Sequence, residues 1–186
     1  YGRAVVCESV EEGIRGLERE LGAKEREKRS ERRERRVVYL FPGQGTQYVG
    51  MGKGLYERES IYKDTVDYCS ERLKGEIGID LREILYAEGE GRERAGAMLK
   101  ETRITQPAMF VVEYSLATLL KSWGIRSEAM IGHSIGEYVA ASLTGVMKLE
   151  DSLRLVAARG RLMEGMGRGG MLGVGLSAEE MEGRLR

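Results

Sequence analysis

The segment Gly-His-Ser-Ile-Gly at residues 132–136 constrains the fold of this chain more than any other feature. A short apolar segment, residues 128–131, precedes it, and residues 138–143 follow with the composition of a tightly packed helix. A serine between two glycines at a strand-to-helix junction is the pattern of a nucleophile elbow, in which a strained turn exposes the hydroxyl group. We therefore predict a strand, a sharp turn at Ser134 and a helix in direct succession.

The residues around Ser134 have separate structural roles in this prediction. Gly132 and Gly136 let the backbone turn sharply and let the helix approach the neighbouring strand. Ser134 would begin the helix, where unpaired N–H groups and the helix dipole favour developing negative charge. Neighbouring strand residues point to opposite faces of a sheet. We therefore expect His133 to pack at the elbow and not to take the serine proton.

Strands and helices alternate along the central part of the chain. The continuous apolar run at residues 37–41 is typical of a strand buried on both faces of a parallel sheet, and a glycine-rich turn follows it at 42–47. Four helices are predicted, at residues 59–74, 80–86, 105–123 and 150–164, mainly from the spacing of their apolar residues. Asp80 would cap the second helix, and a Thr-Gln-Pro sequence would open the third. The segment 87–97 indicates a loop or a weak helix. This alternation predicts an α/β fold with a parallel sheet.

The N-terminal region carries weaker signals. Residues 3–7 predict a short strand, and Ser9 with Glu12 forms a capping box that opens a helix. Every residue from Lys24 to Arg36 is charged except Ser30. Because glutamates are mixed among the basic residues, a solvated helix or linker is favoured over a phosphate-binding surface.

The C-terminal region repeats the alternation. Glycines at residues 165–170 interrupt the helical pattern, and residues 171–174 predict a strand. Ser177 and Glu180 form a second capping box, so we expect a final helix that runs toward Arg186.

Composition excludes some classes of function. The 41% of hydrophobic residues suffice for a core, and the 30 basic and 30 acidic side chains cancel, so nothing favours nucleic acid or a membrane surface as partner. No apolar run reaches the length of a membrane span. Cys7 and Cys69 have no metal-ligand spacing, so we expect no metal site, and reduced thiols are typical of a cytoplasmic protein.

Four motifs together resemble the malonyl-CoA:carrier-protein acyltransferases. They are Phe-Pro-Gly-Gln-Gly-Thr-Gln at 41–47, Thr-Gln-Pro-Ala at 105–108, Gly-His-Ser-Ile-Gly-Glu at 132–137 and Ala-Arg-Gly at 158–160. Their order and spacing are similar to those of this family from residue 37 to about residue 176. The N-terminal segment is similar to the linker between ketosynthase and acyltransferase domains in type I polyketide synthases.

This resemblance implies a domain organisation and partners. Residues 1–36 would be the linker, 37–168 the first part of a parallel-sheet large subdomain that resembles the α/β-hydrolases, and 169–186 the beginning of a small ferredoxin-like subdomain. The substrate would be malonyl-CoA, with no bound cofactor. The partners would be an acyl carrier protein, through its phosphopantetheine thiol, and an adjacent ketosynthase domain.

The resemblance also implies roles for individual residues. Ser134 would carry the acyl group as an ester, and the backbone N–H groups of Gln44 and Ile135 would bind the oxyanion. Arg159 would hold the malonyl carboxylate, the alternative being an ordinary surface arginine. Gln106 would face the active site, the alternative being a helix N-cap. Ile135 is similar to the residue of malonyl-type domains, whereas methylmalonyl-type domains often have glutamine there.

One expected group is missing from the sequence. The general base of the family is a histidine far beyond the nucleophile, but His133 is the one histidine here and the chain ends at Arg186. We therefore expect the 186-residue chain by itself to transfer acyl groups poorly. Two alternatives stay open: a serine hydrolase with the same elbow, and a truncated, inactive fragment.

Overall fold

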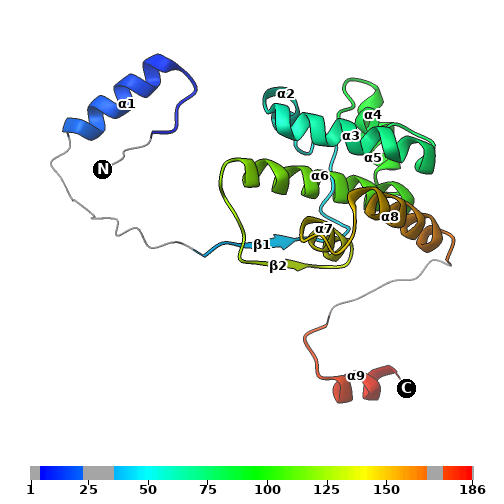
Figure 1. Ribbon diagram of the computed structural model, residues 1–186. Helices are drawn as coiled ribbons and strands as arrows, with labels where there is room; N and C mark the ends of the chain where they lie inside the picture. The colour runs from blue at the N-terminus through cyan, green and yellow to red at the C-terminus, as the bar shows by residue number, and fades with distance from the viewer. Residues whose placement is uncertain (1–4, 23–35, 167–173, 186) are drawn as a thin grey trace. The chain divides into compact units, whose positions relative to one another are not determined.

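The computed structural model describes residues 5–22, 36–166 and 174–185 (Figure 1). The chain divides into two units, Tyr1–Arg35 and Arg36–Arg186. The charged segment 24–36 lies outside the described residues apart from Arg36. The predicted strand 171–174 also lies outside them except for Val174, which is not in a strand.

The first unit contains helix α1, Val10–Gly22. Ser9 Oγ accepts a hydrogen bond from the Glu12 N–H at 3.2 Å, as the predicted capping box requires. The Glu12 carboxylate accepts from the Glu8 N–H at 2.9 Å, one residue earlier than the usual box. The predicted strand at residues 3–7 is wrong for its described part, because residues 5–7 pair with no strand.

Two parallel strands form the sheet of the second unit. Strand β1, Val38–Phe41, pairs with β2, Ala129–Gly132, in a register that places Val38 beside Ala129 and Phe41 beside Gly132. The parallel pairing was predicted. The expectation of burial on both faces of β1 is wrong, because Val38 and Leu40 are 49% and 70% exposed. The described helices cover only the face to which Tyr39 and Phe41 contribute.

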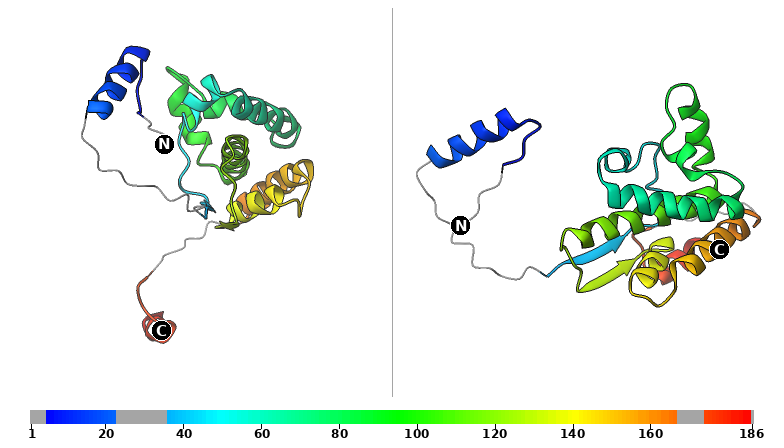
Figure 2. Two further views of the ribbon diagram at one scale, coloured as in Figure 1. Left: turned by 60° about the vertical axis from the view of Figure 1, so that its left-hand side comes forward. Right: turned by 45° about the horizontal axis from the view of Figure 1, so that its top comes forward.

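The other described elements of this unit are helices. Before residue 166 they are α2 (Lys53–Arg58), α3 (Ser60–Ile77), α4 (Leu81–Leu85), α5 (Gly91–Met98), α6 (Thr102–Ser122), α7 (Ile135–Leu143) and α8 (Leu149–Glu164). Helix α6 is central, since it packs against α3, α7 and α8. Figure 1 shows α6 between α3 and the two strands, and Figure 2 shows the same arrangement from two other sides. The short helix α2 was not predicted, because glycines precede and interrupt it.

Helix α6 begins one turn earlier than its Thr-Gln-Pro motif predicts. The Glu101 carbonyl accepts from the N–H groups of Ile104 and Thr105, both at 2.8 Å. The Thr105 hydroxyl also donates to the Leu99 carbonyl at 2.6 Å. Gln106 therefore lies inside the helix, where it is 1% exposed. The alternative interpretation of Gln106 as an N-cap is wrong.

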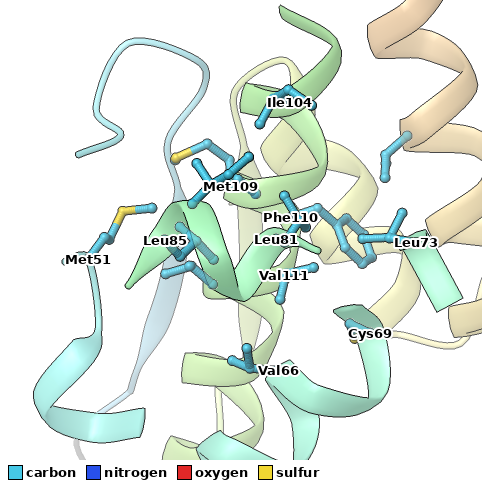
Figure 3. Packing of buried hydrophobic residues seen from close by; sticks show 14 of the residues in the cluster. Met51, Val66, Cys69, Leu73, Leu81, Leu85, Ile104, Met109, Phe110 and Val111 are labelled. Carbon is cyan, nitrogen blue, oxygen red and sulfur yellow. The ribbon is translucent and has the colours of Figure 1, made fainter. Parts of the chain in front are cut away.

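A large part of the hydrophobic core lies between α6 and α3. Met109, Phe110 and Val111 of α6 pack with side chains of α3 and α4, among them Val66, Cys69, Leu73, Leu81 and Leu85 (Figure 3). Each such side chain contributes about 1.5–3 kcal/mol when it is fully buried. Burial also raises the pKa of the Cys69 thiol to about 12, so this cysteine is no candidate nucleophile.

The last described element is α9, Ala178–Leu185. Ser177 Oγ accepts from the Glu180 N–H at 3.3 Å, and the Glu180 carboxylate accepts from the Ser177 N–H at 2.9 Å. These reciprocal bonds confirm the second predicted capping box.

Candidate active site

Ser134 is held in a strained backbone conformation between β2 and α7. Its φ of 54° and ψ of −111° make it the non-glycine residue of positive φ among the described residues. Such a conformation costs about 1–3 kcal/mol and persists only where the surrounding structure enforces it. The predicted sequence of strand, sharp turn and helix is present, and the Ser134 side chain is exposed.

Two glycines enforce this turn by their lack of a side chain. A Cβ on Gly136 would lie 2.4 Å from the Phe41 carbonyl oxygen, and one on Gly132 would lie 2.2 Å from the Glu137 nitrogen. The Glu137 carboxylate accepts from the Gly132 N–H at 3.2 Å and ties the first turn of α7 to the end of β2. This role of Glu137 was not predicted, although an acidic residue in a first helical turn is a usable signal.

Arg159 of α8 reaches Ser134 from a neighbouring helix. Its Nη2 donates to Ser134 Oγ at 3.2 Å, and its Nη1 donates to Gln106 Oε1 at 2.5 Å. Three residues that are far apart in the sequence therefore meet at one point. Arg159 is half-buried and hydrogen-bonded on both sides, whereas Arg154 on the same helix is exposed.

Two further side chains contact Gln106 and Arg159. Gln106 Nε2 lies 3.2 Å from Met163 Sδ, and the Arg159 guanidinium carbon lies 5.4 Å from the centre of the Tyr138 ring. Neither contact was predicted. Met163 follows Arg159 by one helical turn, and Tyr138 follows Ser134 by one turn, so helical spacing could have identified them.

The N–H groups of Ile135 and Gln44 are available to a ligand. Neither donates a backbone hydrogen bond within the described residues. Ile135 is the first residue of α7, where an N–H has no partner in its own helix. The Gln44 side chain donates to Thr102 Oγ1 at 3.3 Å, which anchors the glycine-rich turn to α6.

His133 joins the elbow to that same turn. Its N–H donates to the Phe41 carbonyl at 2.9 Å, and a Cβ on Gly43 would lie 2.4 Å from its Nδ1. Its ring therefore packs on the Gly43 backbone. Among the described residues, no imidazole or carboxylate hydrogen-bonds to Ser134 Oγ. No group of three possible metal ligands occurs among them either, and none of their helices is long and apolar enough to cross a membrane.

Comparisons with known proteins match the part of the chain that contains this site. The acyl transferase domain family matches residues 38–186. A phenolphthiocerol/phthiocerol polyketide synthase protein of Mycobacterium tuberculosis is 42% identical over 146 residues, which cover 78% of this chain and 9% of that protein. The spectinabilin polyketide synthase protein NorB of Streptomyces orinoci is 44% identical over 147 residues, 78% of this chain and 7% of that protein.

Solved structures of acyl transferases are also similar to this chain. The acyl transferase domain of ZmaA is 44% identical with a TM-score of 0.74, over 80% of this chain and 34% of that one. The malonyl CoA-acyl carrier protein transacylase of Clostridium perfringens is 31% identical with a TM-score of 0.64, over 80% and 45%. The chain thus spans under a tenth of these synthases and under half of these solved chains. With its α/β fold, parallel sheet and serine elbow, it belongs to the acyl transferase domain family.

Proposed function

We propose that Ser134 is the nucleophile of an acyltransferase that moves malonyl units from coenzyme A to a carrier protein. The single observation that carries this proposal is the contact of Arg159 Nη2 with Ser134 Oγ at 3.2 Å. A guanidinium fork beside a strained serine can hold a carboxylate next to the ester that the serine forms. The likeness to the Clostridium perfringens malonyl CoA-acyl carrier protein transacylase supports the same substrate class.

The chemistry would proceed in two half-reactions. Ser134 Oγ attacks the thioester carbonyl, the bond to sulfur breaks, and the thiol of coenzyme A leaves with a proton. The thiol of a carrier-protein phosphopantetheine then attacks the serine ester, and Ser134 regains its proton. In each half-reaction, the N–H groups of Gln44 and Ile135 would stabilise the oxyanion.

Arg159 would bind the free carboxylate of the malonyl group. In the absence of substrate, its Nη2 donates to Ser134 Oγ while Gln106 Oε1 holds its Nη1. An incoming carboxylate would replace the hydroxyl as the acceptor of Nη2. Gln106 would keep the guanidinium in place during this exchange, because this residue lies within α6 and is only 1% exposed.

The proton of Ser134 needs an acceptor that the described residues do not supply. The ring of the one histidine packs on Gly43, and neither it nor a described carboxylate hydrogen-bonds to Ser134 Oγ. We propose that residues 1–186 alone are acylated slowly. Robust acylation of purified 1–186 by malonyl-CoA, dependent on Ser134 and followed by intact mass, would refute this part of the proposal.

The wider context of the chain is part of the same proposal. Residues 37–168 would belong to a large subdomain that resembles the α/β-hydrolases, and 169–186 would begin a small ferredoxin-like subdomain. Residues 1–36 would link an adjacent ketosynthase domain. The polyketide synthase relatives support this context, as does the coverage of 34% of the ZmaA domain.

A chimera tests the proposed activity. Residues 38–166 of this chain replace the equivalent part of the ZmaA acyl transferase domain, and transfer from malonyl-CoA to an acyl carrier protein is measured. We expect activity that Ser134→Ala abolishes and that Arg159→Ala lowers by about 100-fold for malonyl-CoA, the size of about two lost charge-assisted hydrogen bonds. Arg159→Lys keeps the positive charge but not the two parallel N–H donors of the guanidinium. It should therefore restore only part of the rate of malonyl transfer.

The same chimera separates transfer from hydrolysis. Acetyl-CoA lacks the free carboxylate, so Arg159→Ala should leave the slow rate of acetyl transfer unchanged. A serine hydrolase would instead release free acid from both thioesters, and Arg159→Ala would not change the preference between them. A folded chimera that hydrolyses malonyl-CoA without labelling the carrier protein would contradict the proposed function.

A further inference from the structure

A buried carboxyl group that the proposed chemistry does not use lies in the middle of α6. Glu113 is 8% exposed, and neither of its carboxylate oxygens has a hydrogen-bond partner within the described residues. Burial raises its pKa to about 8. A buried carboxylate is costly unless a donor or a cation satisfies it. The unpartnered group therefore keeps its proton at neutral pH and would release it on pairing with a cation.

Glu113 contributes to the wall of an apolar cavity of about 450 Å³. Residues from α6 and β1 form one side, and residues around α2 and α3 form the other. Its other walls are almost entirely apolar or aromatic and include Met51, Leu55, Tyr62, Met109, Val112 and Leu116. Figure 3 shows Met51 and Met109 from these separate segments. The cavity thus combines an apolar lining with one buried acid.

The cavity follows the unpaired edge of β1. It touches all four residues of this strand, from Val38 to Phe41, and no residue of β2. The cavity therefore lies along the side of β1 that is away from β2.

Free backbone groups point from this edge. The carbonyls of Val37 and Phe41 accept hydrogen bonds from Glu128 and His133 on the β2 side, both at 2.9 Å. Peptide groups alternate in direction along a strand, so those of Val38 and Leu40 point the other way. Within the described residues β1 pairs only with β2. An edge of this kind is a template for another strand.

We propose that this cavity is a docking site for an extended polypeptide segment that pairs with β1 and places an arginine against Glu113. Main-chain bonds to Val38 and Leu40 would provide the pairing, and the apolar walls would accept alternate side chains. A guanidinium offers two parallel donors to the two unpartnered oxygens of Glu113. A small organic amine could satisfy the acid, but it would leave the strand edge unused.

Short synthetic peptides in solution with the 186-residue chain test the proposal. Each peptide alternates valine and threonine and has one arginine, which is moved along the series. Every member has a twin with citrulline, which keeps the shape of arginine and removes its charge. We expect the best arginine peptide to bind at least about tenfold more tightly than its twin, as a desolvated charge pair would require.

Two variants locate the effect. Glu113→Gln should remove the preference for arginine over citrulline, whereas Glu76→Gln, an exposed glutamate of α3, should leave it intact. Hydrogen exchange of the Val38 and Leu40 amides should slow when the arginine peptide binds. The wild-type comparison of arginine with citrulline stands even if Glu113→Gln fails to fold.

Several outcomes would overturn the proposal. These are equal binding of the two peptides, no binding of any peptide, or an arginine preference that persists in Glu113→Gln. Hexylamine binding with no peptide protection at Val38 and Leu40 would instead make the cavity a small-molecule site. Self-association of the chain through β1 that blocks every peptide would make a second copy the occupant. None of these outcomes depends on acyl transfer, so the proposed function would be unaffected.

Discussion

At the level of single residues, the turn at Ser134 has a conformation that costs stability. Ser134 has a φ of 54°, a region that glycine enters freely and other residues rarely adopt. The structure around the turn holds it there through Gly132, Gly136 and the Glu137 carboxylate. The exposed hydroxyl beside Arg159 is thus obtained at a cost in backbone strain.

Replacement of Ser134 should reveal that strain. Ser134→Gly removes both the hydroxyl and the conformational cost, whereas Ser134→Ala removes the hydroxyl alone. We expect the glycine variant to have a free energy of unfolding about 1 kcal/mol higher than the alanine variant, since relief of about 1–3 kcal/mol is offset by the entropy of glycine. Urea denaturation monitored by circular dichroism measures the difference. A glycine variant no more stable than the alanine variant would show that the turn is not strained.

Gly136 offers a second prediction at the residue level. A Cβ there would lie 2.4 Å from the Phe41 carbonyl oxygen, so Gly136→Ala must push α7 away from β1. We expect a loss of more than about 2 kcal/mol in the free energy of unfolding. Gly75→Ala is the matched control, because Gly75 lies within α3 with open space around it. That change should stabilise the chain by about 0.5–1 kcal/mol, and similar effects of the two substitutions would refute the close approach.

At the level of elements, the sequence predicted which segments form helices and strands better than where they begin. Apolar spacing was sufficient for α3 and α8, and short apolar runs were sufficient for β1 and β2. The start of α6 was predicted wrongly, because Pro107 was assigned to the first turn. The helix begins one turn earlier, where the Glu101 carbonyl accepts its first hydrogen bonds. The consequence reaches the candidate site, since this earlier start buries Gln106 inside the helix beside Arg159.

The candidate site was predicted more completely than the elements around it, for a physical reason. Ser134, Gln106 and Arg159 stand in motifs that the resemblance assigned to one site, and their side chains meet in the structure. Met163 and Tyr138 act through contacts that several residue types could make. Glu137 acts through a hydrogen bond from the Gly132 N–H, which only the folded turn shows. The buried acid Glu113 was also missed, because a glutamate on a helix is usually exposed and only the tertiary structure shows its burial.

Glu113 gives helix α6 a testable pH dependence. Its pKa is about 8 in the folded chain, against about 4.3 in an unfolded one. Between these values the folded state holds a proton that the unfolded state has lost. The free energy of unfolding therefore decreases as pH rises through this window, by up to about 1.4 kcal/mol per pH unit. Urea denaturation across the window should show this slope, and Glu113→Gln should remove it.

The matched control for this prediction is Glu76→Gln on an exposed part of α3, which should keep the slope. Other groups that titrate in the same window contribute equally to all three proteins, so the comparison isolates Glu113. A Glu113→Gln variant with the slope of the original chain would show that the carboxyl is solvated or has a partner in solution.

At the level of the whole unit, one face of the sheet is apolar and exposed. Val38 and Leu40 of β1 are 49% and 70% exposed, and Ile131 of β2 is 59% exposed. The parallel register places Leu40 directly beside Ile131. The core lies against the opposite face of the sheet, where Phe41 of β1 and Ile135 of α7 are buried. Stability and solubility therefore depend on different faces of the same two strands.

This separation predicts that solubility can be improved without loss of stability. Leu40→Thr combined with Ile131→Thr replaces exposed apolar side chains by β-branched polar ones that suit a strand. We expect less concentration-dependent association in analytical ultracentrifugation, and a free energy of unfolding within about 0.5 kcal/mol of the original, as for other surface substitutions. Ile135→Thr, at the fully buried first residue of α7, should instead cost about 2 kcal/mol or more. If the double variant unfolded as readily as Ile135→Thr, both faces of the sheet would have to be buried in solution, and association of the chain through this face would be the simplest cause.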